Sequence, residues 1–448
     1  MISTSNLQLA FQAPDITSTA MKKAIEDWFQ LYYLQEPTKE EDPCEQVAHT
    51  IVKKLTKAVF SEYTATSKNA FAAQILDALS AVCGEVAQQT FIGGMSLLKP
   101  LPEKDGFSFA VVRRDNMLIF GRDAKGRLTD IGTWERSVQR KHYYTLLERR
   151  TVDENGFLTI KNALYRSYTE SDLGSCVPLS TLPRYAQFQD VYTFTEPVYS
   201  VGLVPVCVPI ENCVDGSKDA VSVYAPAVGK IHNINRNEAQ LNGEFERGKS
   251  KIMASADMFR KDKTGNRAIT DDVFVGFDDD PETVGITIFS PQLREASFLA
   301  RKQDYLRSIE NIIGLKRGLL SEVEAVERTA KEITSSEGDY SLTVTDLQQM
   351  WEKSAREALR LCGILGKLYH IPGAADVPED AAVFNWGNGV LYDEEKTYKE
   401  LKEQVSMGLL QPERLLGWYH NLPCDTPTQR EKIRKDYMPQ IEDTGEDE

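Results

Sequence analysis

The residues best suited to chemistry are aspartates between positions 271 and 280. Asp271 and Asp272 precede a run formed by Asp278, Asp279 and Asp280. Carboxylates gathered in this way can bind divalent cations that support phosphoryl transfer. However, consecutive aspartates in a strand or turn point in different directions, and a proline follows them at once, as in an exposed turn. The sequence therefore favours a solvated turn, and a metal-dependent nuclease using these aspartates is the alternative.

Motifs for other catalytic chemistry are absent from the sequence. It contains no GxSxG, P-loop, GxGxxG or HExxH pattern. The seven cysteines show no CxxC spacing, which indicates reduced thiols instead of a zinc site or a disulfide framework. The histidines are isolated from one another, at His49, His142, His232, His370 and His420. We therefore expect no enzyme, with no catalytic residue, no metal and no cofactor.

Composition bounds the class of protein. The 448 residues suffice for roughly two to four domains, and 41% hydrophobic with 27% charged residues is ordinary for a folded protein. A net charge of −15 argues against tight, sequence-specific DNA binding, which needs a basic surface. An acidic bore would instead repel a duplex evenly and let it slide. The sequence shows no secretion signal and no apolar run of about 18 residues, so we expect no membrane partner.

Two long helical patterns lie in the second half of the chain, after the aspartates at 271–280. One covers Glu295–Ile313 and the other Tyr340–Tyr369, with the insert Gly314–Asp339 between them. Helices of this length rarely bury both faces in one small domain, which indicates a subunit of an assembly. The apolar residues of the first helix recur at a spacing of seven or lie beside that face. They are Leu299, Leu306, Ile309 and Ile313. Such a face packs either in the core of its own domain or against a neighbouring helix.

The insert is rich in charges of both signs. Its basic residues Lys316, Arg317, Arg328 and Lys331 are interleaved with glutamates. One interpretation is a mobile element that touches a polyanion. The other is a solvated amphipathic helix with ion pairs four residues apart, such as the pair formed by Glu324 and Arg328. Local physical chemistry alone favours the second interpretation.

The rest of the chain predicts a mixed α+β fold. Residues 1–95 show helical spacing, and residues 107–208 read as an antiparallel meander of strands separated by turn residues. Residues 220–247 return to a helical pattern, with Pro226 in its first turns or delaying its start. Residues 249–289 form a short unit with strand-like pieces at the far end of the two long helices. A loop, a strand-like piece and a terminal helical group follow, at 394–407, 412–419 and 427–437.

The order of these parts resembles that of the portal proteins of tailed bacteriophages, in the branch found in siphophages of Firmicutes. The resemblance covers about residues 20–440. It departs at Lys331, where the family commonly has threonine, and residues 271–280 match no fixed motif. The matching segments are VKKLTKAVFSEY, GFLTIKNALYRS, RKQDYLRSIENIIGLKRGLLSE, TAKEITSSEGDY and VFNWGNGVLYDEEKTYKELKEQVSMGLLQPERLL.

The resemblance implies a portal fold with a helical stem, a small α/β clip, a β-rich wing with a long helix, and a helical C-terminal crown. Lys316, Arg317, Arg328 and Lys331 would then face the DNA channel, and the seven-spaced face would pack the stem. Asp271, Asp272, Asp278 and Asp279 would form a docking surface on the clip. The implied parts are N-terminal helices and wing 1–219, first stem helix 220–247, clip 248–291, second stem helix 292–313, tunnel loop 314–336, wing helix and strand 337–391, crown 392–440 and a disordered acidic tail 441–448.

The function implied by the resemblance is structural. A portal protein forms a homo-oligomeric ring, expected to be a dodecamer, at one vertex of the capsid, and double-stranded DNA passes through it without sequence specificity. Its partners would be the terminase large subunit, a head–tail connector protein, and the major capsid and scaffolding proteins. Its location would be the virion, and the host cytoplasm during assembly. The alternatives are the metal-dependent nuclease and a cytosolic scaffold protein unrelated to phage.

Overall fold

A computed structural model of the chain describes the residues on which the fold rests. These are residues 3–33, 44–248, 292–322, 330–378, 381–387, 394–420, 422–424 and 426–438, with the backbone of short strands at 251–253, 260–261, 267–268 and 287–289. The chain divides into unit 1, Met1–Trp386, and unit 2, Gly387–Glu448. The mixed α+β class predicted from the sequence is confirmed.

The N-terminal part of unit 1 is helical, as predicted. Ser18 starts the second helix by accepting a hydrogen bond from the backbone N–H of Met21 at 3.1 Å. Asn69 starts the fourth by accepting from the N–H groups of Phe71 and Ala72 at 2.9 and 3.1 Å. The helices are α1 (Thr4–Phe11), α2 (Thr19–Tyr32), α3 (Val47–Phe60) and α4 (Ala70–Gly93).

Helix α4 is the central helix of unit 1. Phe71, Ile75, Leu76 and Leu79 are buried, and α2, α3 and the strands of the adjoining sheet contact the helix. Within the part of the chain that the structure describes, α4 is also the one helix long and apolar enough to cross a membrane by length and composition. Its contacts within unit 1 are those of a core helix.

Most of the predicted meander forms a six-stranded antiparallel sheet in the order β4-β5-β6-β7-β8, with β9 paired to β7. Two of its turns are closed by aspartate. The Asp123 carboxylate accepts from the N–H groups of Lys125 and Arg127, and the Asp153 carboxylate closes the next turn in the same way. The strands are β4 (Met117–Arg122), β5 (Leu128–Gln139), β6 (His142–Val152), β7 (Leu158–Ser167), β8 (Ser175–Val177) and β9 (Val191–Thr193).

A second sheet carries the order β10-β2-β3 and packs with the first around a shared core. Its strands are β2 (Met95–Pro102), β3 (Phe107–Val112) and β10 (Val204–Cys207). Leu97 of β2 lies in one buried cluster with Ile119 of β4, Ile131 of β5 and Leu203. The two sheets therefore share a hydrophobic core.

A buried ion network crosses between the sheets. The Glu148 carboxylate of β6 lies 2.7 Å from the Lys99 ammonium of β2 and 2.7 Å from the Arg150 guanidinium. Arg150 also donates to the carbonyl oxygens of Val201 and Gly202 at 3.3 and 3.0 Å. Burial alone would raise the pKa of Glu148, but the two cations outweigh it and lower that pKa to about 2.

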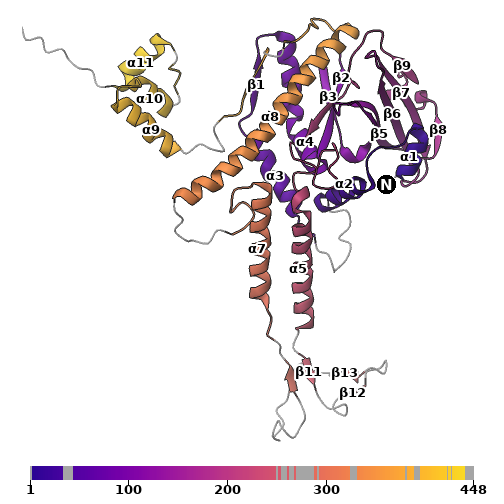
Figure 1. Cartoon of the computed structure of the whole chain (residues 1–448), viewed down its shortest axis with the longest axis horizontal. Helices are drawn as coiled ribbons and strands as arrows, with labels where there is room; N and C mark the ends of the chain where they lie inside the picture. The colour runs from indigo at the N-terminus through magenta and orange to yellow at the C-terminus, as the bar shows by residue number, and fades with distance from the viewer. Residues whose placement is uncertain are drawn as a thin grey trace, which may run out of the picture. The chain divides into compact units, whose positions relative to one another are not determined.

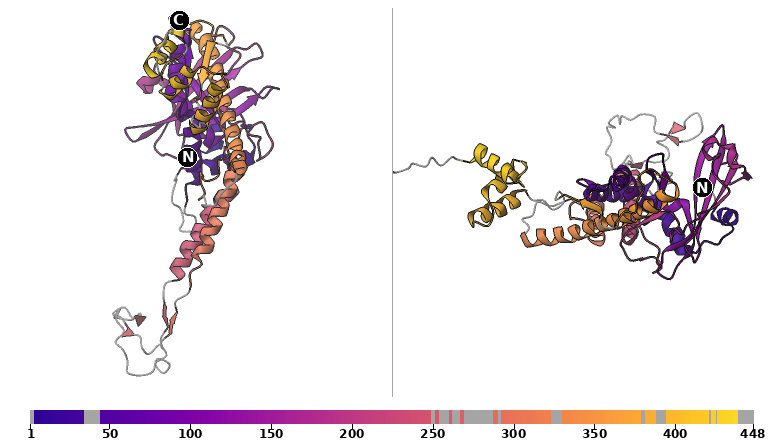
Figure 2. Two further views of the ribbon diagram at one scale, coloured as in Figure 1. Left: turned by 90° about the vertical axis from the view of Figure 1, so that its left-hand side faces the viewer. Right: turned by 90° about the horizontal axis from the view of Figure 1, so that it is seen from above.

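Two long helices extend side by side from the body of unit 1 (Figures 1 and 2). Short strands follow the first helix and precede the second. They are α5 (Val228–Arg247) and α7 (Glu295–Ile313), and between them β11 (Lys251–Met253) pairs with β14 (Thr287–Phe289) and β12 (Arg260–Lys261) with β13 (Arg267–Ala268). The bounds predicted for α7 are confirmed. Of the two positions predicted for Pro226, the one that delays the start of α5 is confirmed, because the segment around Pro226 forms a 3-10 turn, Ala225–Ala227, and the helix begins after it at Val228 instead of residue 220.

Helix α8 (Ala330–Leu368) runs back along the body. It starts ten residues before the predicted Tyr340, so the helix enters the predicted tunnel loop 314–336 instead of following it. The chain then forms β15 (Ala382–Asn385), which pairs with β1 (Thr64–Ser67). The next residue, Trp386, donates its indole N–H to the Glu352 carboxylate of α8 at 2.7 Å and packs on the Tyr63 ring.

Unit 2 holds the predicted terminal helices. They are α9 (Glu394–Ser406), α10 (Pro412–Tyr419) and α11 (Pro427–Tyr437). Thr426 and Gln429 form a reciprocal capping box at the start of α11, and Arg434 pairs with the buried Glu413 at 2.9 Å. The assignment of these segments to stem, clip, wing and crown stays a prediction.

Candidate functional site

The candidate site is the helix pair α5 and α7 with the loop that follows α7. The Asn237 amide of α5 donates to the Phe298 carbonyl oxygen of α7 at 3.0 Å. Near the outer ends of the helices, the Arg294 guanidinium donates twice to the Glu244 carboxylate, at 3.0 and 3.1 Å. These hydrogen bonds lower the pKa of Glu244. They hold α5 and α7 in register but add little to stability, because the bridge is open to solvent.

A charged network joins the helix pair to the N-terminal helices. The Lys302 ammonium of α7 lies 2.9 Å from the Glu45 carboxylate and 3.4 Å from that of Glu238 in α5. Burial alone would lower the pKa of Lys302, but the two carboxylates raise it. On α5, the His232 imidazole lies 3.0 Å from the Asp27 carboxylate of α2. The helix pair is therefore tied to α2 through Asp27 and to the segment that leads into α3 through Glu45.

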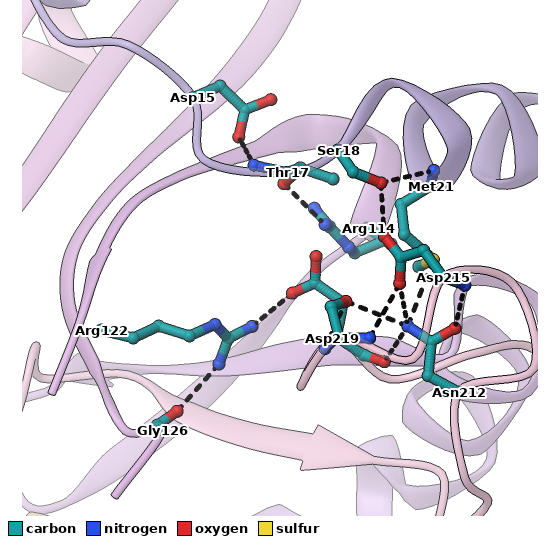
Figure 3. Close-up of polar contacts among 11 residues, drawn as sticks. Asp15, Thr17, Ser18, Met21, Arg114, Arg122, Gly126, Asn212, Asp215 and Asp219 are labelled. Carbon is teal, nitrogen blue, oxygen red and sulfur yellow. Dashed lines mark hydrogen bonds and ion pairs between the residues drawn. The ribbon is translucent and has the colours of Figure 1, made fainter. Parts of the chain in front are cut away.

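Polar contacts also hold the segment that leads into α5 (Figure 3). The Asn212 amide donates to the Asp215 carboxylate at 2.9 Å and to the Asp219 carbonyl oxygen at 3.1 Å. The Ser18 hydroxyl donates to Asp215, and the Arg122 guanidinium pairs with Asp219 at 2.7 Å. The segment at 212–219 is thus attached both to the start of α2 and to β4.

Arg114 lies inside the same group of contacts and is 3% exposed. Its guanidinium donates to the Thr17 hydroxyl at 3.3 Å. Burial lowers the pKa of Arg114, and the charges of Asp219 and Asp15 oppose that shift. A buried guanidinium beside two carboxylates is a structural tie between the N-terminal segment and the sheet.

The predicted packing face of α7 is divided in two. Leu306 and Ile309 are buried within the chain, and Ile313 is half-buried. Leu299 and Ile312, by contrast, are 46% and 41% exposed. The interpretation that this face packs in the core of its own domain therefore holds for Leu306 and Ile309, whereas Leu299 is exposed in the single chain. Contact with a neighbouring subunit stays a prediction.

The predicted channel residues lie in three different settings. Lys316 and Arg317 are exposed in the loop between α7 and α8. Lys331 lies in the first turn of α8, where the backbone alone is described. Arg328 lies outside the described residues, as do the predicted clip aspartates Asp271, Asp272, Asp278 and Asp279. Within the described ranges, no group of three His, Cys, Asp or Glu side chains is placed to hold a metal ion.

The sequence interpretation missed Glu310, which organises the loop after α7. Its carboxylate is buried and accepts hydrogen bonds from the N–H groups of Gly318, Leu320 and Ser321 at 3.1, 2.5 and 2.9 Å. Its second oxygen accepts from the Ser321 hydroxyl at 2.7 Å. A sequence signal existed, because Glu310 stands on the same helical face as Leu306 and Ile309, and a charge on an apolar face needs hydrogen-bond partners.

Gly314 ends α7 in a position that admits no side chain. Its φ is +75°, and a Cβ added there would lie 2.4 Å from the Thr343 hydroxyl oxygen of α8. We expect Gly314→Ala to lower the free energy of unfolding by at least about 1–2 kcal/mol, from backbone strain alone. Chemical denaturation checks this. The double variant Gly314→Ala/Thr343→Ala removes the clash but keeps the strain, so it should recover part of the loss, and full recovery would contradict the role of φ.

Comparison with known proteins finds likeness to solved structures. No protein-family model matches the chain, and no curated protein matches it. A solved structure described as the neck of a native GTA particle, computed with C12 symmetry, is similar at 11% sequence identity and a TM-score of 0.47. The likeness covers 94% of this chain and 99% of that chain. A TM-score this low carries no argument about function, so the function must be argued from the helix pair and its loop.

Proposed function

We propose that this chain is a phage portal protein, which forms the ring through which double-stranded DNA enters and leaves a capsid. One observation carries the proposal. Helices α5 and α7 leave the body side by side, paired strands lie between them in sequence, and a carboxylate-anchored loop and the long helix α8 follow. This is the order of stem, clip, stem, tunnel loop and wing helix in the family that the sequence resembles.

The proposed mechanism is physical. Exposed apolar residues of the helix pair would be covered by the pair of a neighbouring subunit. They are Phe245, Leu293 and Leu299 toward its outer end and Ile312 in the last turn of α7. The polar sides of the helices would face water and DNA, whose passage requires no bond to be made or broken. On this proposal the chain is not an enzyme and needs no cofactor.

The proposal includes partners that follow from the role. The ring is a homo-oligomer, expected to be a dodecamer, at a unique capsid vertex of the virion. The terminase large subunit would dock on it during packaging, and a head–tail connector would dock on the clip at 248–291. The major capsid and scaffolding proteins would surround it, after assembly in the host cytoplasm.

Electron microscopy of the purified chain tests the proposal. We expect rings with a central hole, and particles that stay monomeric with no ring under any salt condition would contradict it. The nuclease alternative is tested separately with Asp279→Ala. Cleavage of DNA with Mg²⁺ by the unmodified chain, lost in this variant, would replace the portal assignment with an enzyme.

The exposed basic pair Lys316 and Arg317 gives a prediction for DNA. We expect Lys316→Gln/Arg317→Gln to form normal rings but to retain packaged DNA less well, with the salt slope of DNA binding reduced by about 2 if each residue meets one phosphate. DNA content of purified particles over a salt series measures this. Arg140→Gln/Lys141→Gln, an adjacent exposed pair in the turn between β5 and β6, is the matched control. Loss of the ring in the Lys316/Arg317 variant would show a structural role instead.

A further inference from the structure

The loop at 314–322 converges on one carboxylate. Besides the four hydrogen bonds to its side chain, the Glu310 carbonyl oxygen accepts from the N–H groups of Gly314 and Leu315, the latter at 2.8 Å. One residue therefore receives the donors of five loop residues. The Glu310 side chain is 1% exposed, so water cannot replace these bonds while the loop stays closed.

Two further contacts hold the loop, and neither of them involves Glu310. The Lys54 ammonium of α3 donates to the Leu319 carbonyl oxygen. The Gln303 amide oxygen of α7 accepts from the Glu322 N–H at 2.9 Å. The loop is thus fixed to α7 at both of its ends and to α3 in its middle, which is an unusual degree of attachment for a surface connection.

We propose that Glu310 is a positioning residue that holds residues 314–322 as a rigid bracket on α7. Lys316 and Arg317 are carried on this bracket, so their backbone keeps a fixed place relative to α7 and α3. A carboxylate suits this role because one oxygen can accept from several converging N–H groups, which no neutral side chain does as strongly. The consequence for DNA contact rests on the channel proposed above, whereas the bracket itself does not.

Hydrogen exchange of the full-length chain tests the bracket. We expect Glu310→Ala to speed amide exchange in peptides covering residues 314–322 at least tenfold. Glu310→Gln, which keeps the shape and one acceptor oxygen, should give an intermediate rate. Asn311→Ala, an exposed neighbour on the same helix, is the matched control and should exchange like the unmodified chain. Exchange at 314–322 that is unchanged in Glu310→Ala would overturn the proposal.

Two readouts separate a bracket from general destabilisation. Exchange in α4, in the core of unit 1, should stay unchanged in both Glu310 variants, and faster exchange there would mean that Glu310 supports the whole unit instead. If Glu310→Ala does not fold, the comparison of Glu310→Gln with Asn311→Ala decides, because the proposal requires faster exchange confined to 314–322 in the former alone.

DNA retention then tests the functional part. Rings of Glu310→Gln should form normally and retain DNA less well than rings of Asn311→Ala, in the direction of the Lys316/Arg317 variant. Local loosening without any loss of DNA retention would leave the bracket intact and remove its link to the channel. Absence of rings in the unmodified chain would instead contradict the proposed function and not the bracket.

Discussion

Leu299→Asp and Ile312→Asp are each expected to abolish ring assembly and leave a folded monomer. The two residues are 46% and 41% exposed in the single chain, so a carboxylate at either position can reach water and replaces no fully buried side chain. In a ring, the same carboxylate would be buried against a neighbouring helix without a partner, at a cost of several kcal/mol for every interface. Because that cost recurs at each subunit contact, the equilibrium should shift from ring to monomer.

Analytical ultracentrifugation with electron microscopy measures this shift, and circular dichroism confirms that the monomer is folded. Val138→Asp is the matched control, since Val138 is 61% exposed on β5 and lies away from the helix pair. Rings that persist in both Leu299→Asp and Ile312→Asp would show that this part of α7 does not contact a neighbour, and the proposed stem packing would fail.

Glu148→Gln is expected to destabilise unit 1 by about 3 kcal/mol at pH 7, because it leaves the buried Arg150 and the half-buried Lys99 without their shared counter-charge. The wild-type chain should lose a similar amount in acid. The pKa of Glu148 is lowered from 4.5 to about 2 in the folded state, so its contribution is complete above pH 4.5 and is lost as the pH falls toward 2.

Denaturation at a series of pH values compares the stability lost in Glu148→Gln with the stability that the wild-type chain loses in acid. The difference in unfolding free energy between wild type and Glu148→Gln should be constant from pH 7 to about 5 and should narrow below it. Asp123→Asn removes the charge of an exposed pair with Arg127 but keeps an oxygen for the N–H groups of the turn, so at pH 7 it should change stability much less than Glu148→Gln does. A difference that stays constant down to pH 2 would mean that the two cations do not lower the pKa of Glu148 in the folded chain.

Local sequence patterns predicted the helices and strands whose ends are marked by residues close by in the chain. The bounds of α7 follow from its periodicity and from Gly314, which takes the left-handed conformation that ends a helix. The start of α8 was misplaced for a related reason. Gly338 and Asp339 predicted a break, yet a glycine costs only about 1 kcal/mol inside a helix, and α8 continues through it over 39 residues.

Sequence patterns could not predict the features that residues far apart in the chain build together. The four donors that meet the Glu310 carboxylate lie in a loop whose course depends on packing against α3 and α8. The Lys99, Glu148 and Arg150 network joins two sheets, and neither its burial nor its pairing shows in the alternation of β6. In the same way, Glu45 and Glu238 are 193 positions apart, and nothing local indicates that both face Lys302.

The pairing of β15 with β1 has a mechanical consequence for whatever acts on unit 2. The chain leaves unit 1 through Trp386, so tension on the C-terminal helices reaches the body at the end of β15 where Asn385 faces Thr64. Here that end is reinforced by the Trp386 bond to Glu352, so the first contact to break is a charge-assisted one. Tension on unit 2 therefore acts on this hydrogen bond before it acts on the four residue pairs that join β15 to β1.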